Sequence, residues 1–329
     1  VVSFSATDST ICVGDCIDFT DLSTNGPTTW TWYFFGSATP NSGLQIPTNI
    51  CYNTAGTFDV AIVASNPSGP ESLFLANFIT VSALPTVTAS NDTSICAGDN
   101  ANISVSGTAS TYSWDNGLGI GTNFAVSPGT NTTYIVTGTD ANNCVALDSV
   151  IVTVNPLPTV LASNDTAICL GDSAAISVSG TASTYSWDNG LGAGTSFMVA
   201  PTGTTTYIVT GTDANSCSAL DSVIVTINPL PTVIASNDTT ICTGDPANLS
   251  ASGAATYSWD NGLGVGQNQT PSPVATTTYT VTGTDANGCT NTDSVVVTVT
   301  NCNVPPIAAM SASSTALCIN DCVDFTDIS

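Results

Sequence analysis

The sequence predicts an all-β protein, made of tandem β-sandwich domains arranged as an extended rod. First, the motif LPTV begins at Leu84, Leu157 and Leu230, so a unit of 73 residues is repeated. Second, apolar and polar residues alternate with a period of two, and no segment has the period of an amphipathic helix. Third, Gly, Pro and Asn-Gly interrupt these segments about every 8–12 residues, which is typical of strands in a sandwich.

The repeats divide the chain into four expected domains and a fragment. Residues 84–156, 157–229 and 230–303 are copies of one unit, and residues 1–83 are a different unit. The stretch STICVGDCIDFTDLS near the start returns as STALCINDCVDFTDIS at the end. Residues 304–329 therefore read as the truncated start of a second unit of the first kind, and we expect the sequence to be an excerpt from a longer chain.

Alternation within the repeat predicts which side chains face the core. Strands of this length rich in β-branched residues bury one face. The Asn-Gly pairs at Asn116, Asn189 and Asn261 supply the positive φ angles that tight hairpin turns need. In the first repeat we expect one shared face for each of three groups: Val150, Val152 and Val154; Tyr134 and Val136; Ile103 and Val105.

The charge composition excludes several classes of function. The chain has 24 acidic residues and no Lys, Arg or His, for a formal net charge of −24. It offers nothing basic to nucleic acid or to an acidic membrane. It also has no imidazole base, no Schiff-base lysine and no Ser-His pair, so we predict that it is not an enzyme and binds no organic cofactor. No apolar run approaches the ~18 residues of a membrane span, so we expect no membrane insertion in this segment.

Twelve cysteines without a histidine favour disulfides over zinc sites, and an oxidising compartment outside the cytoplasm. Each 73-residue unit has two cysteines, so we expect one bond inside each unit, one inside the first unit and one across the junction near the end. Cys12 and Cys322 would then have partners outside the given sequence. The five expected bonds are Cys96–Cys144, Cys169–Cys217, Cys242–Cys289, Cys16–Cys51 and Cys302–Cys318.

Each 73-residue unit resembles an immunoglobulin-like β-sandwich. In the first repeat the residues that support this resemblance are Cys96, Trp114, Tyr134 and Cys144. The resemblance implies that Trp114 fills the core from a central strand. The cysteines depart from the antibody pattern, because Cys96 precedes its strand and Cys144 follows another.

The first unit resembles the polycystic-kidney-disease (PKD) domain, which is also a β-sandwich. That family usually has Trp-x-Phe-Gly-Asp-Gly where this chain has Trp32, Phe34, Phe35 and Gly36 without the Asp-Gly. Any property that depends on that Asp is not expected here.

The combination of the two kinds of unit resembles the giant repetitive surface adhesins of Bacteroidetes, among them gliding adhesins exported by the type IX secretion system. This implies an extracellular location at the cell surface and a structural or adhesive role. It also implies O-glycosylation at Asp-Ser or Asp-Thr sequences. The candidates are Ser9, Ser149, Thr166, Ser173, Ser222, Thr239 and Ser294.

The repeated Thr-Asp-Ala-Asn turns are candidate calcium sites. Calcium takes carboxylate and carbonyl oxygens from loops, and each turn places an Asp and an Asn two residues apart. The same residue types also stabilise turns by binding their own backbone, which needs no metal. The candidate ligands are Asp140, Asn142, Asp213, Asn215, Asp285 and Asn287.

Three functions remain open from the sequence. The near-identical copies favour a passive stalk or spacer in a surface adhesin. A self-assembling extracellular filament is the second, since sandwich edge strands can pair between chains. A polysaccharide-binding module is the third, with Trp114, Trp187 and Trp259 either stacking on sugars or, as we favour, filling the core. The expected partners are neighbouring repeats, other copies of the chain or extracellular polysaccharide.

Overall fold

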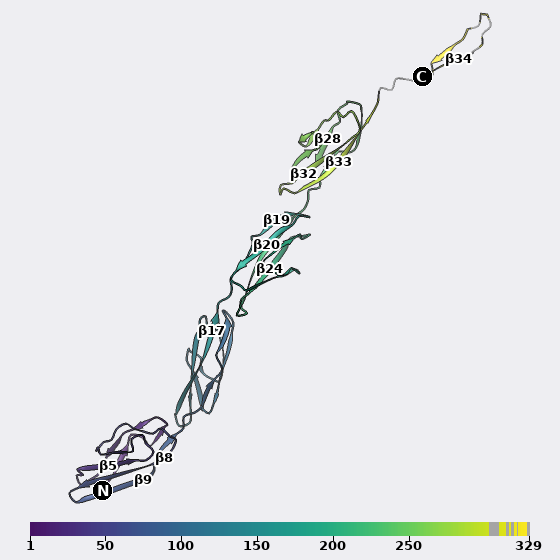
Figure 1. Ribbon diagram of the computed structural model, residues 1–329. Helices are drawn as coiled ribbons and strands as arrows, with labels where there is room; N and C mark the ends of the chain where they lie inside the picture. Colours follow the sequence, from purple (N-terminus) through teal and green to yellow (C-terminus); the bar gives the residue numbers. More distant parts are fainter. Residues whose placement is uncertain (303–308, 314–315, 317–318, 321, 328–329) are drawn as a thin grey trace. The chain divides into compact units, whose positions relative to one another are not determined.

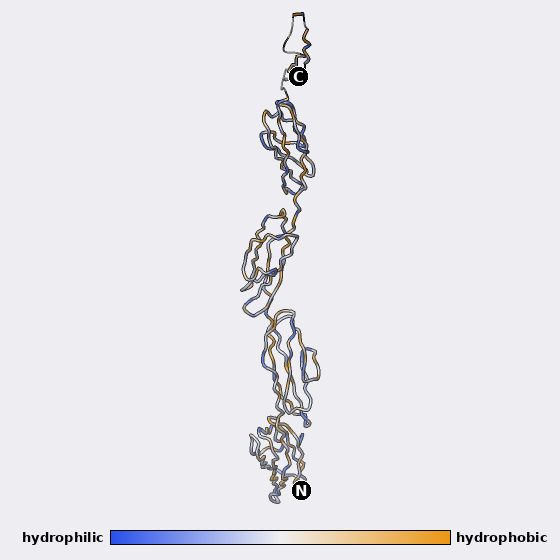
Figure 2. Tube along the Cα trace, turned by 90° about the vertical axis from the view of Figure 1, so that its right-hand side faces the viewer, coloured by the Kyte–Doolittle hydropathy of each residue, from blue (hydrophilic) through white to orange (hydrophobic). Residues whose placement is uncertain are grey.

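The structure, a computed structural model, describes residues 1–302, 309–313, 316, 319–320 and 322–327 (Figure 1). Every regular element in these described ranges is a β-strand, so the predicted all-β class is confirmed. No strand pairs with a strand from another of the segments 1–83, 84–156, 157–229 and 230–303. Hydrophobic residues occur throughout all four segments (Figure 2), as expected if each has its own core.

The first segment has nine strands in a five-stranded sheet and two small two-stranded sheets. The order in the large sheet is β2-β9-β8-β5-β6, and β1 pairs with β4 and β3 with β7. The strands are β1 (Phe4–Ala6), β2 (Thr10–Cys12), β3 (Cys16–Ile17), β4 (Phe19–Asp21), β5 (Thr29–Phe34), β6 (Asn41–Ser42), β7 (Ile50–Cys51), β8 (Gly56–Asn66) and β9 (Gly69–Ser82).

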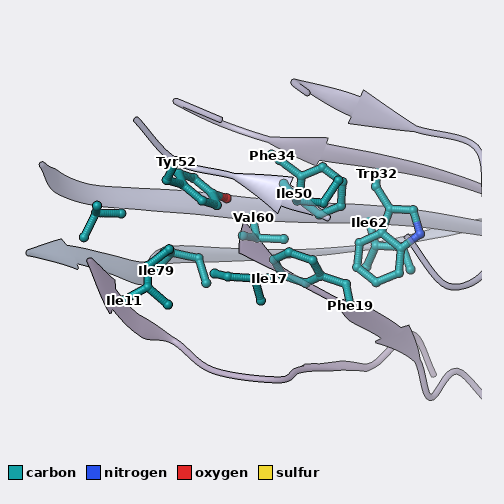
Figure 3. Close-up of a cluster of buried hydrophobic side chains, with 11 residues drawn as sticks. Ile11, Ile17, Phe19, Trp32, Phe34, Ile50, Tyr52, Val60, Ile62 and Ile79 are labelled. Carbon is teal, nitrogen blue, oxygen red and sulfur yellow. The ribbon is translucent and has the colours of Figure 1, made fainter. Parts of the chain in front are cut away.

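Aromatic side chains fill the core of this segment. Trp32, Phe34 and Phe19 are fully buried, and the rings of Trp32 and Phe34 are stacked with centroids 5.6 Å apart. Figure 3 shows these rings beside Ile62, Ile17 and Val60 between the strands. Trp32 and Phe34 belong to the sequence WYFFG on which the PKD resemblance rests, so two of its hydrophobic positions are core positions.

The first repeat has eight strands in two sheets. The large sheet has the order β11-β17-β16-β13-β14, and the small one has the order β10-β12-β15. All pairings are antiparallel except that of β11 with β17, which is parallel. The strands are β10 (Val87–Ala89), β11 (Thr93–Cys96), β12 (Ala101–Gly107), β13 (Thr111–Trp114), β14 (Gly119–Ile120), β15 (Asn123–Val126), β16 (Thr132–Thr139) and β17 (Val145–Asn155).

The second and third repeats have the same sheets in the same order. In the second repeat the strands are β18 (Val160–Ala162), β19 (Thr166–Cys169), β20 (Ala174–Gly180), β21 (Thr184–Trp187), β22 (Gly192–Ala193), β23 (Ser196–Val199), β24 (Thr205–Thr212) and β25 (Ser218–Asn228). In the third they are β26 (Ile234–Ala235), β27 (Thr239–Cys242), β28 (Leu249–Ser252), β29 (Thr256–Trp259), β30 (Gly264–Val265), β31 (Asn268–Gln269), β32 (Thr277–Thr284) and β33 (Thr290–Thr300).

The core of each repeat lies between its two sheets. In the first repeat Ile103 from β12 packs in one cluster with Val136 from β16 and Val150 from β17. Val150 and Val152 are fully buried while Ile151 between them is 42% exposed, so the predicted alternation is confirmed. The two-residue period therefore places one face of each long strand in the core.

Two strands near the end of the chain repeat the pairing of β1 with β4. β34 (Met310–Ala312) pairs antiparallel with β35 (Phe325–Asp327), and Ala312 lies opposite Phe325 as Ala6 lies opposite Phe19. Phe19 is fully buried, whereas Phe325 is 68% exposed.

By its contacts the chain divides into two compact units. One comprises Val1–Pro158 together with Asp213–Cys217, and the other comprises Thr159–Thr212 together with Ser218–Ser329. The short segment Asp213–Cys217 belongs to the first unit and includes a cysteine that is bonded to Cys96.

Candidate functional site: the inter-repeat disulfides and their supporting turns

Three of the five disulfides among the described residues join one predicted domain to the next. In each case a cysteine near the start of one segment bonds a cysteine near the end of the following segment. The three bonds between segments are Cys12–Cys144, Cys96–Cys217 and Cys169–Cys289. The other two stay inside a segment: Cys16–Cys51, as expected, and Cys242–Cys302, which joins the start of the third repeat to its end.

The expected bonds inside the repeats, Cys96–Cys144, Cys169–Cys217 and Cys242–Cys289, are wrong. The reason is the parallel pairing of β11 with β17, which places Cys96 opposite Asn155 at the end of β17. Cys144 directly precedes the first residue of β17. The 11 residues of that strand span about 36 Å, whereas bonded cysteines have Cα atoms no more than about 7 Å apart.

The expected bond Cys302–Cys318 is also wrong, although Cys318 itself lies outside the described residues. β27 runs parallel to β33, and Cys242 at its end lies opposite Thr300. Cys302 lies two residues after Thr300 and forms a disulfide with Cys242, with a Cα–Cα distance of 5.4 Å. Cys12 was expected to bond outside the sequence, but it bonds Cys144. Cys322 is exposed and has no disulfide partner among the described residues.

In each of the three bonds between segments, an aspartate fixes the turn that contains the second cysteine. Asp140 Oδ1 accepts hydrogen bonds from the backbone N–H of Asn142 and of Cys144, both at 2.8 Å. The Asp140 N–H donates in turn to the Cys144 carbonyl oxygen at 3.0 Å, and Asn143 takes a positive φ of 60°. Cys144 is 1% exposed. The Thr-Asp-Ala-Asn motif therefore fixes the backbone around the half-cystine.

The second and third repeats contain the same turn. Asp213 Oδ1 accepts the N–H groups of Asn215 and Cys217, and Asp285 Oδ1 accepts those of Asn287 and Cys289. Each candidate calcium turn thus contributes one carboxylate, of which one oxygen already binds the backbone. Within the described part of the chain, no three His, Cys, Asp or Glu side chains lie together as a metal site would require. Calcium binding by these turns stays a prediction.

The Trp-Asp-Asn-Gly turns are structural. Trp114 is 4% exposed, and its Nε1–H donates to the Gly121 carbonyl oxygen at 3.1 Å. Trp187 and Trp259 are equally buried and make the equivalent bond. The prediction that these three residues fill the core is confirmed, and their faces are not available for stacking on a sugar.

The Asp and Asn of the same motif attach the turn to the neighbouring strand. Asp115 Oδ1 accepts the backbone N–H of Ile135 at 2.9 Å, and Asn116 Nδ2 donates to the Thr133 carbonyl oxygen at 3.0 Å. Asn116 has φ of 51°, in the left-handed region that the Asn-Gly pair predicted. Its side chain also donates to Asp115 Oδ1, so the two polar residues act together.

A further aspartate joins the two sheets of each repeat. Asp148 on β17 accepts the backbone N–H of Ala89 on β10 through Oδ2 and that of Ser149 through Oδ1, both at 2.8 Å. Asp221 and Asp293 occupy the same position in the other repeats. The N–H groups of Ala235 and Ser294 hold the pKa of Asp293 below its ordinary value. With no cationic side chain in the sequence, backbone N–H groups are the donors that these carboxylates use.

The candidate glycosylation residues are accessible. Thr166 and Thr239 are half-buried, and the other five, Ser9, Ser149, Ser173, Ser222 and Ser294, are exposed. Modification of these residues stays a prediction.

Exposed aromatic rings gather on the outer face of the first segment's large sheet. In the sheet register Tyr33 on β5 and Phe74 on β9 lie on either side of Ala61 on β8. Tyr33, Phe35 and Phe74 are 42%, 49% and 55% exposed, and the rings of Phe35 and Phe74 are 6.3 Å apart. We name these three residues the aromatic patch. The two-residue period places Tyr33 and the core residue Trp32 on opposite faces of β5, but it does not show which face is covered.

No protein-family model matches the chain, and neither does any curated protein. Among solved structures, a Ca²⁺-stabilized adhesin that helps an Antarctic bacterium reach out and bind ice aligns over 91% of this chain and 99% of its own, at 17% identity and a TM-score of 0.30. Immunoglobulin domains 1–5 of Sidekick-1 align over 91% and 81%, at 14% identity and a TM-score of 0.26. An I-band fragment of titin aligns over 69% and 98%, at 11% identity and a TM-score of 0.34. Scores this low say nothing about the function of this chain.

No helix among the described residues is long and apolar enough to cross a membrane.

Proposed function

We propose that this chain is a non-enzymatic, extracellular structural or adhesive repeat region, the stalk or spacer of a surface adhesin. The observation that supports it is the covalent linkage of each of the first three predicted domains to the next, through the bonds Cys12–Cys144, Cys96–Cys217 and Cys169–Cys289. A spacer must keep its units in series, and disulfides between successive units serve that requirement directly.

The proposed domains are 1–83, 84–156, 157–229 and 230–303, with 304–329 as the start of a further unit. The five disulfides fit an extracellular site, because such bonds persist in oxidising compartments. Attachment to a cell surface, export by a type IX system and glycosylation at the seven candidate residues follow from the family resemblance and belong to the proposal.

Electron microscopy of the purified, oxidised chain, combined with light scattering, tests the proposal. We expect extended particles at the mass of one chain. Compact particles would contradict a spacer, and regular fibres would favour the filament alternative. A parallel preparation in EDTA tests the calcium prediction, since calcium-dependent particles would lose their extended form.

Binding of a neutral polysaccharide is a second candidate function, favoured by the aromatic patch. Exposed aromatic rings offer apolar faces for stacking, and a chain of net charge −24 repels anionic polysaccharides. The test is retention of the chain on insoluble neutral polysaccharides, compared with Tyr33→Ala/Phe74→Ala. Substitution of the exposed Leu147 and Ile151 in the first repeat is the matched control, because it removes apolar surface elsewhere.

A further inference from the structure

Four disulfides, the three between segments and Cys242–Cys302 inside the third repeat, form overlapping loops along the chain. The loops close residues 12–144, 96–217, 169–289 and 242–302, so each loop begins before the preceding one ends. Every peptide bond between Cys12 and Cys302 therefore lies inside at least one disulfide loop. A single break in the backbone of this region leaves the two parts of the molecule covalently joined.

The same connectivity sets how far the molecule can be stretched. The shortest covalent route from Cys12 to Cys302 crosses to Cys144, follows the backbone to Cys169, crosses to Cys289 and follows the backbone to Cys302. This route contains about 38 residues of backbone, which extend to roughly 130 Å at ~3.4 Å per residue. The reduced chain between the same two residues contains about 290 residues and extends to roughly 1,000 Å.

Unfolding of the sandwiches cannot lengthen the oxidised chain between Cys12 and Cys302 beyond the shortest route, because the two disulfides on it stay closed.

A second, longer route runs beside the first. It crosses from Cys12 to Cys144, returns along the backbone to Cys96, crosses to Cys217, and follows the backbone to Cys242 and its bond with Cys302. It contains about 73 residues of backbone and becomes taut at roughly 250 Å. This route takes the load if the backbone between Cys144 and Cys169 is broken.

We infer that residues 12–302 are a tether of limited extension that stays covalently joined after a single break in its backbone. Load passes along residues 144–169 and 289–302 and through the bonds Cys12–Cys144 and Cys169–Cys289. This inference rests on the proposed function only in assuming that the chain bears load. In this tether Cys169–Cys289 lies on the shortest route and Cys96–Cys217 lies on the reserve route.

Single-molecule force measurement on the full chain, held at Val1 and Ser329, tests the tether. The oxidised chain should become taut with about 130 Å between Cys12 and Cys302, and the reduced chain at roughly 1,000 Å. Cys169→Ser/Cys289→Ser should lengthen the taut state by about 120 Å, because load then follows the longer route. Cys96→Ser/Cys217→Ser should leave the taut length unchanged.

The two double variants are matched, since each removes one inter-repeat bond of nearly equal loop length, 120 and 121 residues. General loss of stability would affect both alike and would change the unfolding force rather than the taut length. Three results would overturn the inference: equal lengthening of the taut state in the two variants, no lengthening in either, or extension of the oxidised chain by several hundred ångströms. The proposed function fails separately, if the oxidised particles are compact while the force results hold.

Discussion

Cys96 lies opposite Asn155 in the parallel pairing of β11 with β17, at the point where the chain leaves the first repeat. From there its sulfur bonds Cys217 of the following repeat rather than the cysteine of its own repeat. The same relationship joins Cys169 to Asn228 and Cys242 to Thr300. The parallel pairing of the short second strand of each repeat with its long last strand is thus the feature that directs each bond forward along the chain.

A protease site inserted at Pro156 tests whether this bond holds the molecule together. The peptide bonds around Pro156 lie inside only one disulfide loop, that of Cys96–Cys217. After cleavage, the oxidised protein should run as one species on a non-reducing gel and as two after reduction. Cys96→Ser/Cys217→Ser should fall into two pieces without reductant, while Cys169→Ser/Cys289→Ser should stay whole. Separation of the cleaved parent chain without reductant would refute the assigned bonds.

Asp148→Asn should destabilise the first repeat by about 1–2 kcal/mol, because one oxygen that accepts a backbone N–H becomes an amide donor. The measurement is the denaturant midpoint of the oxidised protein. Asp99→Asn is the matched control, since the structure gives the exposed Asp99 carboxylate no hydrogen bond. Equal effects of the two substitutions would mean that general charge, and not the bond between sheets, sets the stability.

Stability of the third repeat should fall in acid. The pKa of Asp293 is lowered in the folded state by the N–H groups of Ala235 and Ser294. A lowered folded pKa stabilises the protein above the unfolded value of about 3.9, and this contribution is lost as the pH falls through the folded pKa. Urea unfolding between pH 6 and pH 2 should show the decline, and Asp293→Asn should flatten it. An unchanged slope in that variant would assign the decline to other carboxylates.

Much of the fold could be predicted from the sequence. The alternation of Val150, Ile151 and Val152 placed the core face correctly because a strand has a fixed period of two. Trp114 was correctly placed in the core.

The disulfide pairing could not be predicted by counting two cysteines per repeat, because the count is equally compatible with bonds inside and between repeats. The deciding fact is the parallel pairing of residues 93–96 with residues 152–155, a long-range contact that local pattern does not specify. The aromatic patch was missed for a related reason. Phe34 and Phe35 are adjacent aromatic residues, and the two-residue period places their rings on opposite faces without showing which face is covered.

Tyr52→Phe should leave the protein as stable as before or stabilise it by up to about 1 kcal/mol. The Tyr52 side chain is fully buried and its hydroxyl has no hydrogen-bond partner, so its removal relieves an uncompensated desolvation. Burial raises the pKa of Tyr52 to about 12, which agrees with a hydroxyl shielded from water.

Tyr257→Phe provides the contrast. The Tyr257 hydroxyl donates to the Ala254 carbonyl oxygen at 2.9 Å and accepts the Ala254 N–H at 2.8 Å. Loss of this hydroxyl should therefore lower the free energy of unfolding by about 1–2 kcal/mol. Denaturant midpoints of the two variants, measured with the disulfides intact, should move in different directions or by clearly different amounts. A loss at Tyr52 as large as that at Tyr257 would show that a bound water or another partner satisfies the Tyr52 hydroxyl.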